Sequence, residues 1–582
     1  MGLAITTEAM LYTVIIGVAA VLRLWNLQAA PLTTREAAQA LAAFNGSSLP
    51  AGGSPLLYGL NQVLFGLFST MVNDAGVRLG AALIGTIMVL LPALFRSHIG
   101  RYGALAAALM LALSPTLVVA SRSLDGSIGV ATCALAAIGL GLRYFTTHKQ
   151  IDLIGLAIAI GVALVCGSGV ITVMFVIVPA LIVIHRWVAS DEDRLRVKQL
   201  QQESHTLRQA LLWGGAAFVL AATTFFLRPN GLAGVPEILS AWLAAWANSA
   251  TGSAQVSISV VQLVQILLTY DLLMLCFGVA GLIFALRRTS GLSVLLSVWA
   301  IGALLMVMLQ PGRQVLDLTL VLTPLALLGG SLLDRVGTEL ERRGSWRVDG
   351  LFALVVAALV GFVAIRAGNA AMGLVPPTDS FLGMRLSVSE TFFIGVVLIM
   401  VVLVAVFVVL MGWRATLRAV AMTLFALLAV MAWSNAWRVT QLRPGDPREL
   451  VWGPTTTSLD VSAMTEAIAA ASKRNTGFLD QVPVAVTLPQ DDPVVRWYLR
   501  RFKNAQVNAV IADLAPVIVA PLGSSFPPNV SDAYQGKQFV IQTQWDAAQL
   551  TDNDFMRWWL YRESDLPPTP VQTMVVWLKV KP

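Results

Sequence analysis

The residues AMLYTVIIGVAAVLRLWNL, Ala9 to Leu27, decide the fold, and the polar stretch QAAPLTTREAAQALAAF, Gln28 to Phe44, follows them directly. The first stretch is long enough to cross the roughly 30 Å hydrocarbon core of a bilayer as one helix. Arg23 stands near its end, and Glu36 lies in the polar stretch. Because charge beside a bilayer is costly, a guanidinium and a carboxylate at the mouth of a membrane helix predict a functional site.

The composition of the whole chain is that of an integral membrane protein. Of the 582 residues, 57% are hydrophobic and only 12% are charged, which excludes an ordinary soluble enzyme. Apolar stretches of about 20 residues recur and predict an all-α polytopic membrane protein. The first span lacks a basic segment before it and contains Arg23, so we interpret it as a retained helix and not as a signal peptide.

The charge and the cysteines narrow the function classes further. The net charge of +7 comes mostly from loops between the apolar stretches, so it predicts no nucleic-acid partner. Cys133, Cys166 and Cys276 lie in apolar stretches, which argues against a disulfide framework. The four histidines are scattered without the spacing of metal ligands, so we expect neither a divalent metal nor another cofactor.

Hydropathy places about thirteen membrane-spanning helices in the chain. Arg and Lys gather in alternate loops, as at Arg186–Arg208 and Arg335–Arg347, and the positive-inside rule makes those loops cytoplasmic. The N-terminus is then cytoplasmic, and an odd number of spans puts the C-terminal part outside a plasma (inner) membrane. The expected spans are 9–27, 78–97, 103–120, 126–145, 151–166, 170–187, 209–227, 266–286, 291–309, 315–333, 350–368, 391–412 and 417–435.

Two domains are expected, a transmembrane domain over residues 1–435 and an external α/β domain over 436–582. The external loop 28–77 carries two amphipathic helices that lie along the membrane surface or only pack against it, and a third is expected from Pro236 to Asn248. Strands alternate with helices in the C-terminal domain. Its expected strands are 482–487, 517–521, 538–543 and 571–580, and its expected helices are 461–473 and 494–502.

Two aromatic clusters mark this external domain, WYLR at 497–500 and WWLYR at 558–562. Such side chains stack on sugar rings in some proteins, but more often they form a core or an interface. We therefore favour packing for both clusters.

Ionisable residues recur at the expected external ends of separate helices, where a water-filled outward cavity explains them better than chance. Carboxylates in such a cavity are able to accept protons, and cations there are able to stabilise an anionic group. The residues placed at these ends, besides Glu36, are Arg78, Arg122, Asp125, Tyr270, Asp271, Arg313 and Asp317.

Three segments carry a resemblance to GT-C membrane glycosyltransferases, in particular to the mannosyl- and aminoarabinosyl-transferases of family 39. PLTTREA, at 31–37, resembles the family's Pro-Leu-x-x-Asp-Glu-Ala motif, with Glu36 in place and Arg35 where the family has Asp. LAAALMLALSPTLVVASRSLD, at 105–125, resembles the third span and the Asp that follows it. Arg313 and the stretch LVLTPLALLGG, at 320–330, resemble the late segment whose Arg lies by the lipid phosphate.

The resemblance implies a cell-envelope glycosyltransferase that moves a sugar from a polyprenyl-phosphate donor to an acceptor hydroxyl at the outer membrane face. It implies Asp125 and Glu36 as candidate catalytic residues and Arg313 as a candidate ligand of the donor phosphate. Arg78 is a second candidate phosphate ligand because it stands at the expected outer end of the second span. Membrane lipids surround the protein, and the acceptor is a lipid, a glycan or a protein. The residues expected to line the cavity are Arg35, Arg122, Tyr270, Asp271 and Asp317.

Alternative interpretations remain for these residues and for the function. Asp125 is also placed to cap a helix N-terminus. Arg78 and Arg313 are also placed to extend to lipid headgroups. Arg35 beside Glu36 would lower its basicity, which favours Asp125 as the base. The second function class is a GT-C protein that has lost catalysis and serves as a binding or assembly subunit of a membrane complex. A transporter is disfavoured, because no pair of matched broken helices stands out in the two halves.

Overall fold

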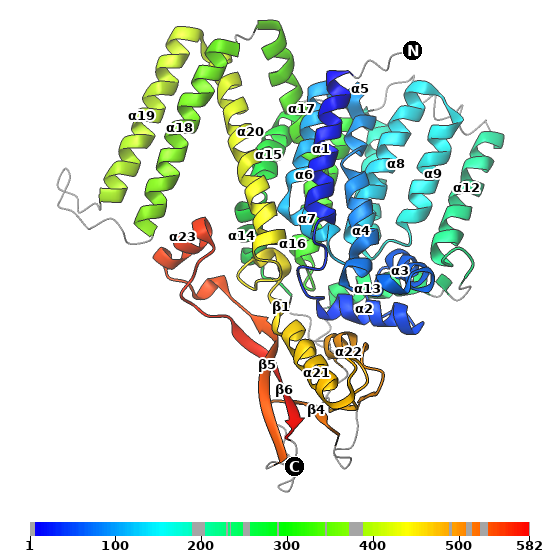
Figure 1. Ribbon diagram of the computed structural model, residues 1–582. Helices are drawn as coiled ribbons and strands as arrows, with labels where there is room; N and C mark the ends of the chain where they lie inside the picture. The colour runs from blue at the N-terminus through cyan, green and yellow to red at the C-terminus, as the bar shows by residue number, and fades with distance from the viewer. Residues whose placement is uncertain are drawn as a thin grey trace.

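The computed structural model describes residues 6–188, 204–227, 231–232, 234–247, 257–287, 290–343, 346–371, 388–487, 492–507, 515–523 and 533–580. A bundle of long helices makes up most of the molecule, and a sheet with three helices lies at one end of it (Figure 1). Helix α1 begins at the other end of the bundle (Figure 1). The expected all-α membrane bundle with a small C-terminal α/β domain is confirmed.

Each of the expected spans coincides with one or two helices in the structure. By length and composition, seven helices in the described residues are able to cross a membrane, or nine if each of two bent pairs counts as one span. The count of thirteen spans stays a prediction. The helices are α1 (Thr7–Leu24), α4 (Asp74–Met88), α5 (Arg96–Ile99), α6 (Arg101–Leu113), α7 (Pro115–Ser121), α8 (Ser127–Thr147), α9 (Gln150–Ala163), α10 (Gly169–Val183), α12 (Ser204–Ala222), α14 (Val260–Tyr270), α15 (Leu272–Leu286), α16 (Gly291–Leu309), α17 (Thr319–Arg343), α18 (Trp346–Ala371), α19 (Val388–Met411) and α20 (Trp413–Trp437).

Two of the spans are broken, and the breaks meet inside the bundle. Helices α6 and α7 bend by 64° at Ser114, and α14 and α15 bend by 98° at Asp271. The Asp271 carboxylate accepts hydrogen bonds from the hydroxyls of Ser114 and Thr116. Because no water reaches the middle of a packed bundle, polar groups freed at one break need partners of this kind.

Arg23 is buried in the bundle at the first of these breaks and does not stand at its mouth as we expected. Pro115 has no N–H to donate to the Leu111 carbonyl, and Nη2 of Arg23 donates to that carbonyl at 2.8 Å. Nη1 donates to the Ala112 carbonyl at 3.0 Å, and Nε donates to the Ser121 hydroxyl at 3.2 Å. Arg23 therefore ties α1 to the bend between α6 and α7.

Three helices outside the bundle lie between it and the sheet domain (Figure 1). They are α2 (Thr34–Asn45), α3 (Pro55–Leu67) and α13 (Gly234–Ala247), which confirms the amphipathic helices expected from the sequence. Helix α2 begins with a capping box, in which Thr33 and Glu36 bond to each other's backbone N–H groups. This local pattern fixes where α2 starts and therefore where Arg35 and Glu36 lie.

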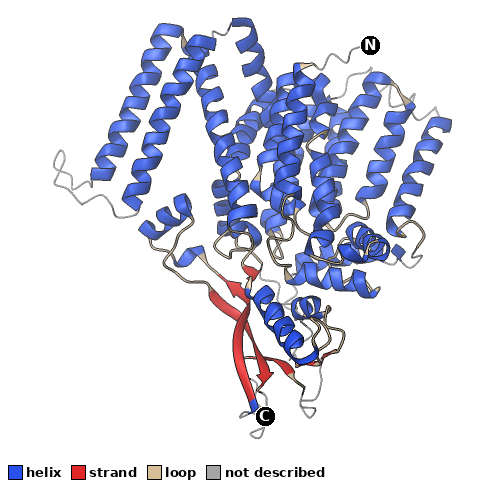
Figure 2. Ribbon diagram, viewed as in Figure 1, coloured by secondary structure: helices blue, strands red, loops and turns tan. Residues whose placement is uncertain are grey.

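The C-terminal domain is a six-stranded mixed sheet in the order β1-β5-β6-β4-β2-β3 (Figure 2). Strands β2, β3 and β4 pair in parallel, and the remaining pairs are antiparallel. The predicted strands and helices are all present, whereas the sequence did not predict β1, β3 or α23. The elements are β1 (Thr455–Thr457), α21 (Asp460–Thr476), β2 (Val484–Val486), α22 (Pro493–Leu499), β3 (Ala505–Val507), β4 (Val517–Pro521), β5 (Tyr534–Gln544), α23 (Asp552–Tyr561) and β6 (Thr569–Lys579).

Candidate functional site

Glu36 is held by five donors at the junction of α2, α4 and the segment before α8. Nε of Arg78 donates to Oε1 at 2.9 Å, and Nη2 donates to Oε2 at 2.8 Å. The Leu124 N–H reaches Oε1 at 3.0 Å, and the Thr33 N–H and hydroxyl reach Oε2 at 2.9 and 3.1 Å. A carboxylate offers about four lone pairs, so this one has no acceptor site to spare.

The ion pair of Glu36 also decides its protonation state. Burial alone raises the pKa of the Glu36 carboxyl, but the charge of Arg78 and the hydrogen bonds from Arg78, Thr33 and Leu124 bring the pKa below its ordinary value. We expected Arg35, the sequence neighbour, to neutralise this carboxylate. The structure shows that Arg78, 42 positions away, is its ion-pair partner.

The guanidinium of Arg78, which binds Glu36, has all its hydrogen-bond donors occupied. Its other hydrogen bonds go to the carbonyls of Leu27, Ala30 and Pro31, so all five N–H groups are engaged and the side chain is 1% exposed. A donor phosphate would reach Arg78 only after Glu36 or a loop carbonyl is released. Its role in phosphate binding stays a prediction.

A second polar group lies on the exposed side of α2. Arg35 is exposed and donates a hydrogen bond to the side-chain oxygen of Gln314, at the start of the short helix η5 (Val315–Leu318). The Gln314 N–H donates to Oδ2 of Asp317 at 2.8 Å. Asp125 and Arg35 both lie close enough to Asp317 to act on it electrostatically. Arg35 is thus joined to Asp317 through Gln314, which no sequence signal marked. The catalytic role of Asp125 and the cavity-lining roles of Arg35 and Asp317 stay predictions.

Asp125 differs from Glu36 in how its oxygens are used. It is half-buried, and Oδ1 accepts from the Ser127 N–H at 2.8 Å at the start of α8. Asp125 precedes the N-cap residue of α8, which is Gly126, and therefore does not cap the helix as the N-cap residue considered above. The preceding residue, Leu124, donates its N–H to Glu36, so Asp125 follows directly after one of the donors that hold Glu36.

Arg313 and Arg122 both cap helix ends through backbone carbonyls. Arg313 donates to the carbonyls of Val307 and Met308 at the end of α16 and to that of Ile258. Arg122 donates to four carbonyls at the end of α1, those of Leu22, Arg23, Trp25 and Asn26. Cations at helix C-termini are stabilising. Three of the five N–H groups of Arg313 are used in this way, and its phosphate-binding role stays a prediction.

Tyr270 and Asp271 are buried in the interior, each 1% exposed. The Tyr270 hydroxyl donates to Oε2 of Glu449 at 2.6 Å, and Nε of Arg562 lies 3.4 Å from the same oxygen. Burial raises the pKa of Glu449 although Arg562 opposes the shift. This cluster joins the C-terminal domain to the bend between α14 and α15. Nothing in the sequence pairs residues so far apart, and the cavity-lining role of Tyr270 and Asp271 stays a prediction.

Both aromatic clusters of the C-terminal domain pack instead of presenting free ring faces. Trp497 and Trp558 are completely buried. The Trp497 indole N–H donates to Asp74 at 2.8 Å, and that of Trp558 donates to the Arg448 carbonyl at 3.0 Å. Arg500 lies over the Trp497 ring, 3.4 Å from its centre. The favoured interpretation, core and interface, is confirmed for these residues.

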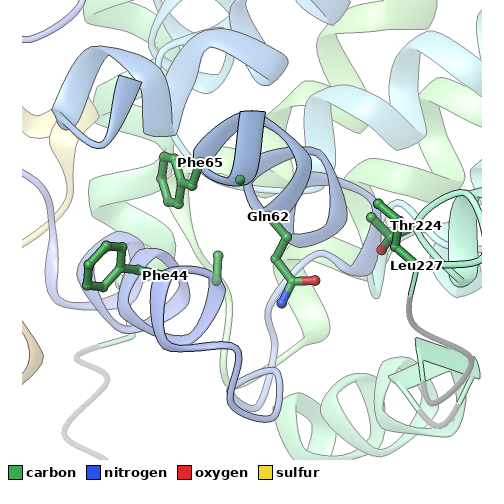
Figure 3. Close-up of a pocket in the computed structure, with 7 residues that line it drawn as sticks. Phe44, Gln62, Phe65, Thr224 and Leu227 are labelled. Carbon is green, nitrogen blue, oxygen red and sulfur yellow. The ribbon is translucent and has the colours of Figure 1, made fainter. Parts of the chain in front are cut away.

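A pocket of about 290 Å³ opens between α2, α3 and the end of α12 (Figure 3). Its lining is mostly apolar, and the amide of Gln62 points into the space between the helices (Figure 3). None of the residues expected to form the outward cavity contributes to it. The lining residues are Ala43, Phe44, Gln62, Phe65, Gly66, Thr224 and Leu227. Among the described residues no group of three or more His, Cys, Asp or Glu side chains is placed to hold a metal ion.

Comparisons with known proteins identify the class of fold to which this chain is similar. Residues 53–223 match the family model described as dolichyl-phosphate-mannose-protein mannosyltransferase. The chain thus has the fold of a GT-C membrane glycosyltransferase and resembles family 39 of that superfamily. No curated protein matches the sequence.

Two solved structures of ArnT from Cupriavidus metallidurans are similar to this chain. The apo structure has 16% sequence identity and a TM-score of 0.51, and the alignment covers 85% of each chain. The structure bound to undecaprenyl phosphate has 14% identity and a TM-score of 0.53, over 88% of this chain and 93% of ArnT. At this identity the likeness establishes the fold.

Proposed function

We propose that the protein is a glycosyltransferase that moves a sugar from a polyprenyl-phosphate donor to an acceptor hydroxyl at the outer face of the plasma membrane. The observation that carries the proposal is the likeness, over most of both chains, to ArnT bound to undecaprenyl phosphate. The group formed by Arg35, Asp125 and Asp317 supports it, because it joins carboxylates to an exposed cation at one place. The positive-inside pattern supports the outer face.

Asp125 is the catalytic base in this proposal. Its carboxylate accepts the proton of the acceptor hydroxyl as the acceptor oxygen bonds to the anomeric carbon of the sugar. The bond between that carbon and the phosphate oxygen breaks, and the polyprenyl phosphate leaves with the electron pair. Glu36 is the weaker candidate, because both of its oxygens are already saturated by donors and its pKa is depressed.

Arg35 is the cation best placed to meet the departing phosphate. It is exposed to solvent, whereas Arg78 is buried. Charge-assisted hydrogen bonds from a guanidinium to phosphate oxygens are strong and directional. Arg35, the residue that departs from the family motif, therefore stabilises the leaving phosphate in this proposal. Arg313 is a second candidate cation for the same role.

A second function is favoured by one specific observation. Arg35 replaces an acid of the family motif, and the acid that remains, Glu36, is locked in an ion pair. A protein with the same fold that binds a lipid-linked sugar without transferring it, as a subunit of a membrane complex, would show this pattern.

One experiment on the full-length protein in lipid nanodiscs distinguishes the glycosyltransferase from the non-catalytic subunit. Undecaprenyl-phosphate-linked sugars are supplied together with lipid, glycan and peptide acceptors, and released undecaprenyl phosphate is measured. The proposed enzyme releases it in an acceptor-dependent way. Saturable donor binding without release for any acceptor would overturn the enzyme and favour the assembly subunit.

A further inference from the structure

Two backbone groups of one buried residue, Leu32, are bonded by side chains of the C-terminal domain. The Leu32 N–H donates to the Tyr498 hydroxyl at 3.0 Å. The Thr457 hydroxyl donates to the Leu32 carbonyl at 2.7 Å. Leu32 is completely buried, so each of these backbone groups would be costly to leave without a partner.

Tyr498 is anchored on its other side by the start of α4. Its hydroxyl donates to Oδ2 of Asp74 at 2.6 Å, while Trp497 donates to Oδ1 of the same carboxylate. Burial raises the pKa of Tyr498, so its hydroxyl keeps the proton that this contact needs. Asp74 lies one helical turn before Arg78, which holds Glu36. One hydroxyl therefore connects α22, α4 and the loop before α2.

The residues after Leu32 are those of the candidate site. Thr33 caps α2, and Arg35 and Glu36 follow in its first turn. A third contact from the domain reaches this turn, because the Gln542 amide donates to the Thr34 hydroxyl at 2.9 Å. Side chains from β1, β5 and α22 thus converge on Leu32–Thr34 from one domain.

We propose that Tyr498 is a positioning residue, through which the C-terminal domain holds Leu32 and the first turn of α2 so that Arg35 faces Asp125 and Asp317. We call the contacts of Tyr498 and Thr457 with Leu32 the Leu32 clamp. The catalytic part of this inference rests on the proposed function, whereas the clamp itself is testable without turnover.

The test uses three variants of the full-length protein in nanodiscs. Tyr498→Phe keeps the ring and removes the hydroxyl that accepts from the Leu32 N–H. Thr457→Val keeps the shape and removes the hydroxyl that donates to the Leu32 carbonyl. Tyr534→Phe is the matched control, because its hydroxyl bonds to the Ala515 carbonyl inside the domain and touches neither loop nor site. Hydrogen–deuterium exchange of the Leu32 amide, thermal unfolding, and kcat and KM for an undecaprenyl-phosphate-linked sugar are measured for each.

Tyr498→Phe removes two hydrogen bonds, the one that the Leu32 N–H donates and the one that Asp74 accepts. Loss of the first, at ordinary strength, predicts exchange at Leu32 that is about fivefold faster. We also expect a fall in kcat with KM nearly unchanged, and a larger loss of stability than in Tyr534→Phe, because Asp74 loses a donor as well. Thr457→Val is expected to lower kcat in the same way.

Exchange at Leu32 equal to that of the control would overturn the clamp. Faster exchange with wild-type kcat would overturn the positioning role. If the wild-type protein shows no turnover, the proposed function and the positioning role are both contradicted. Hydrogen–deuterium exchange of the Leu32 amide would still show whether the Leu32 clamp exists.

Discussion

At the residue scale, the carboxylates of Glu36 and Asp125 differ in the hydrogen bonds that their oxygens accept. The carboxylate of Glu36 accepts hydrogen bonds from a buried arginine, a hydroxyl and two backbone N–H groups. Asp125 accepts one hydrogen bond from the Ser127 N–H and is half-buried. Glu36 is therefore suited to hold the loop in place, whereas Asp125 is the base of the proposed reaction.

The Glu36–Arg78 pair predicts a pH-dependent contribution to stability. The pKa of Glu36 is lowered in the folded protein, so the pair stabilises above the unfolded pKa of about 4.3 and this contribution is lost as pH falls through the folded pKa. Glu36→Gln leaves Arg78 buried without its counter-charge and is expected to cost about 3–5 kcal/mol near neutral pH.

Denaturant unfolding of wild type and Glu36→Gln between pH 7 and pH 3 measures this difference in stability. We expect the gap to narrow as the medium becomes acidic. A gap that stays constant over this range would show that the pKa of Glu36 is the same in the folded and the unfolded protein.

Arg35 yields a prediction about the donor. Arg35→Gln removes one charge-assisted contact, which is worth about 1.5–3 kcal/mol, so KM for the lipid-linked sugar should rise by about 10- to 100-fold. Arg414→Gln, at an exposed arginine at the start of α20, is the control. Donor affinity that is the same in both variants would remove Arg35 from the phosphate site.

Sequence reasoning reached some of these residues and missed others for a physical reason. Asp125, Glu36 and Arg35 stand out because charge at a helix end is visible in one segment of the chain. The pairing of Glu36 with Arg78, of Arg35 with Gln314 and of Tyr270 with Glu449 depends on packing between distant segments. Hydropathy and local motifs carry no information about such pairs.

At the element scale, the two broken spans distinguish this bundle from a set of straight helices. Their position was not predicted, because a bend leaves the hydropathy of a segment unchanged. The Pro115 that interrupts the first was visible in the sequence, but Arg23, which serves the freed carbonyl, lies 88 positions from Leu111. By contrast, the helices and most strands follow from apolar runs and alternation, which are local signals.

This bend predicts an energetic coupling between Arg23 and Pro115. Arg23→Met leaves the Leu111 carbonyl without its donor, at a cost of about 1–3 kcal/mol. In a Pro115→Ala background, residue 115 gains an N–H that is able to serve the same carbonyl, so Arg23→Met should cost less. A double-mutant cycle of unfolding free energies measures the coupling, and strictly additive effects would contradict it.

At the scale of the whole molecule, the C-terminal domain and the candidate site share one end of the bundle (Figure 1). The first turn of α2 lies between the bundle and this domain and is bonded to both. Because α1 begins at the opposite end, the orientation in the membrane decides whether the site meets substrates outside the cell or inside it.

We predict that the sheet domain is external. A cysteine introduced at the exposed Asn475 should react with a membrane-impermeant maleimide in intact cells, or in spheroplasts if an outer barrier is present. A cysteine at the exposed Thr146 should react only after the membrane is opened. The reverse pattern would place the site on the cytoplasmic side and contradict the proposed reaction at the outer face.

The most direct test of the central claim is the rate of sugar transfer by Asp125→Asn. The amide keeps the volume of the side chain but does not accept a proton, and general-base catalysis is typically worth about 10²- to 10⁴-fold. We therefore predict that kcat falls by about that factor while the Kd for the polyprenyl-phosphate sugar stays within about twofold. Asp480→Asn, at a surface ion pair with Lys503, should transfer at the wild-type rate. Transfer by Asp125→Asn at the wild-type rate would contradict the account.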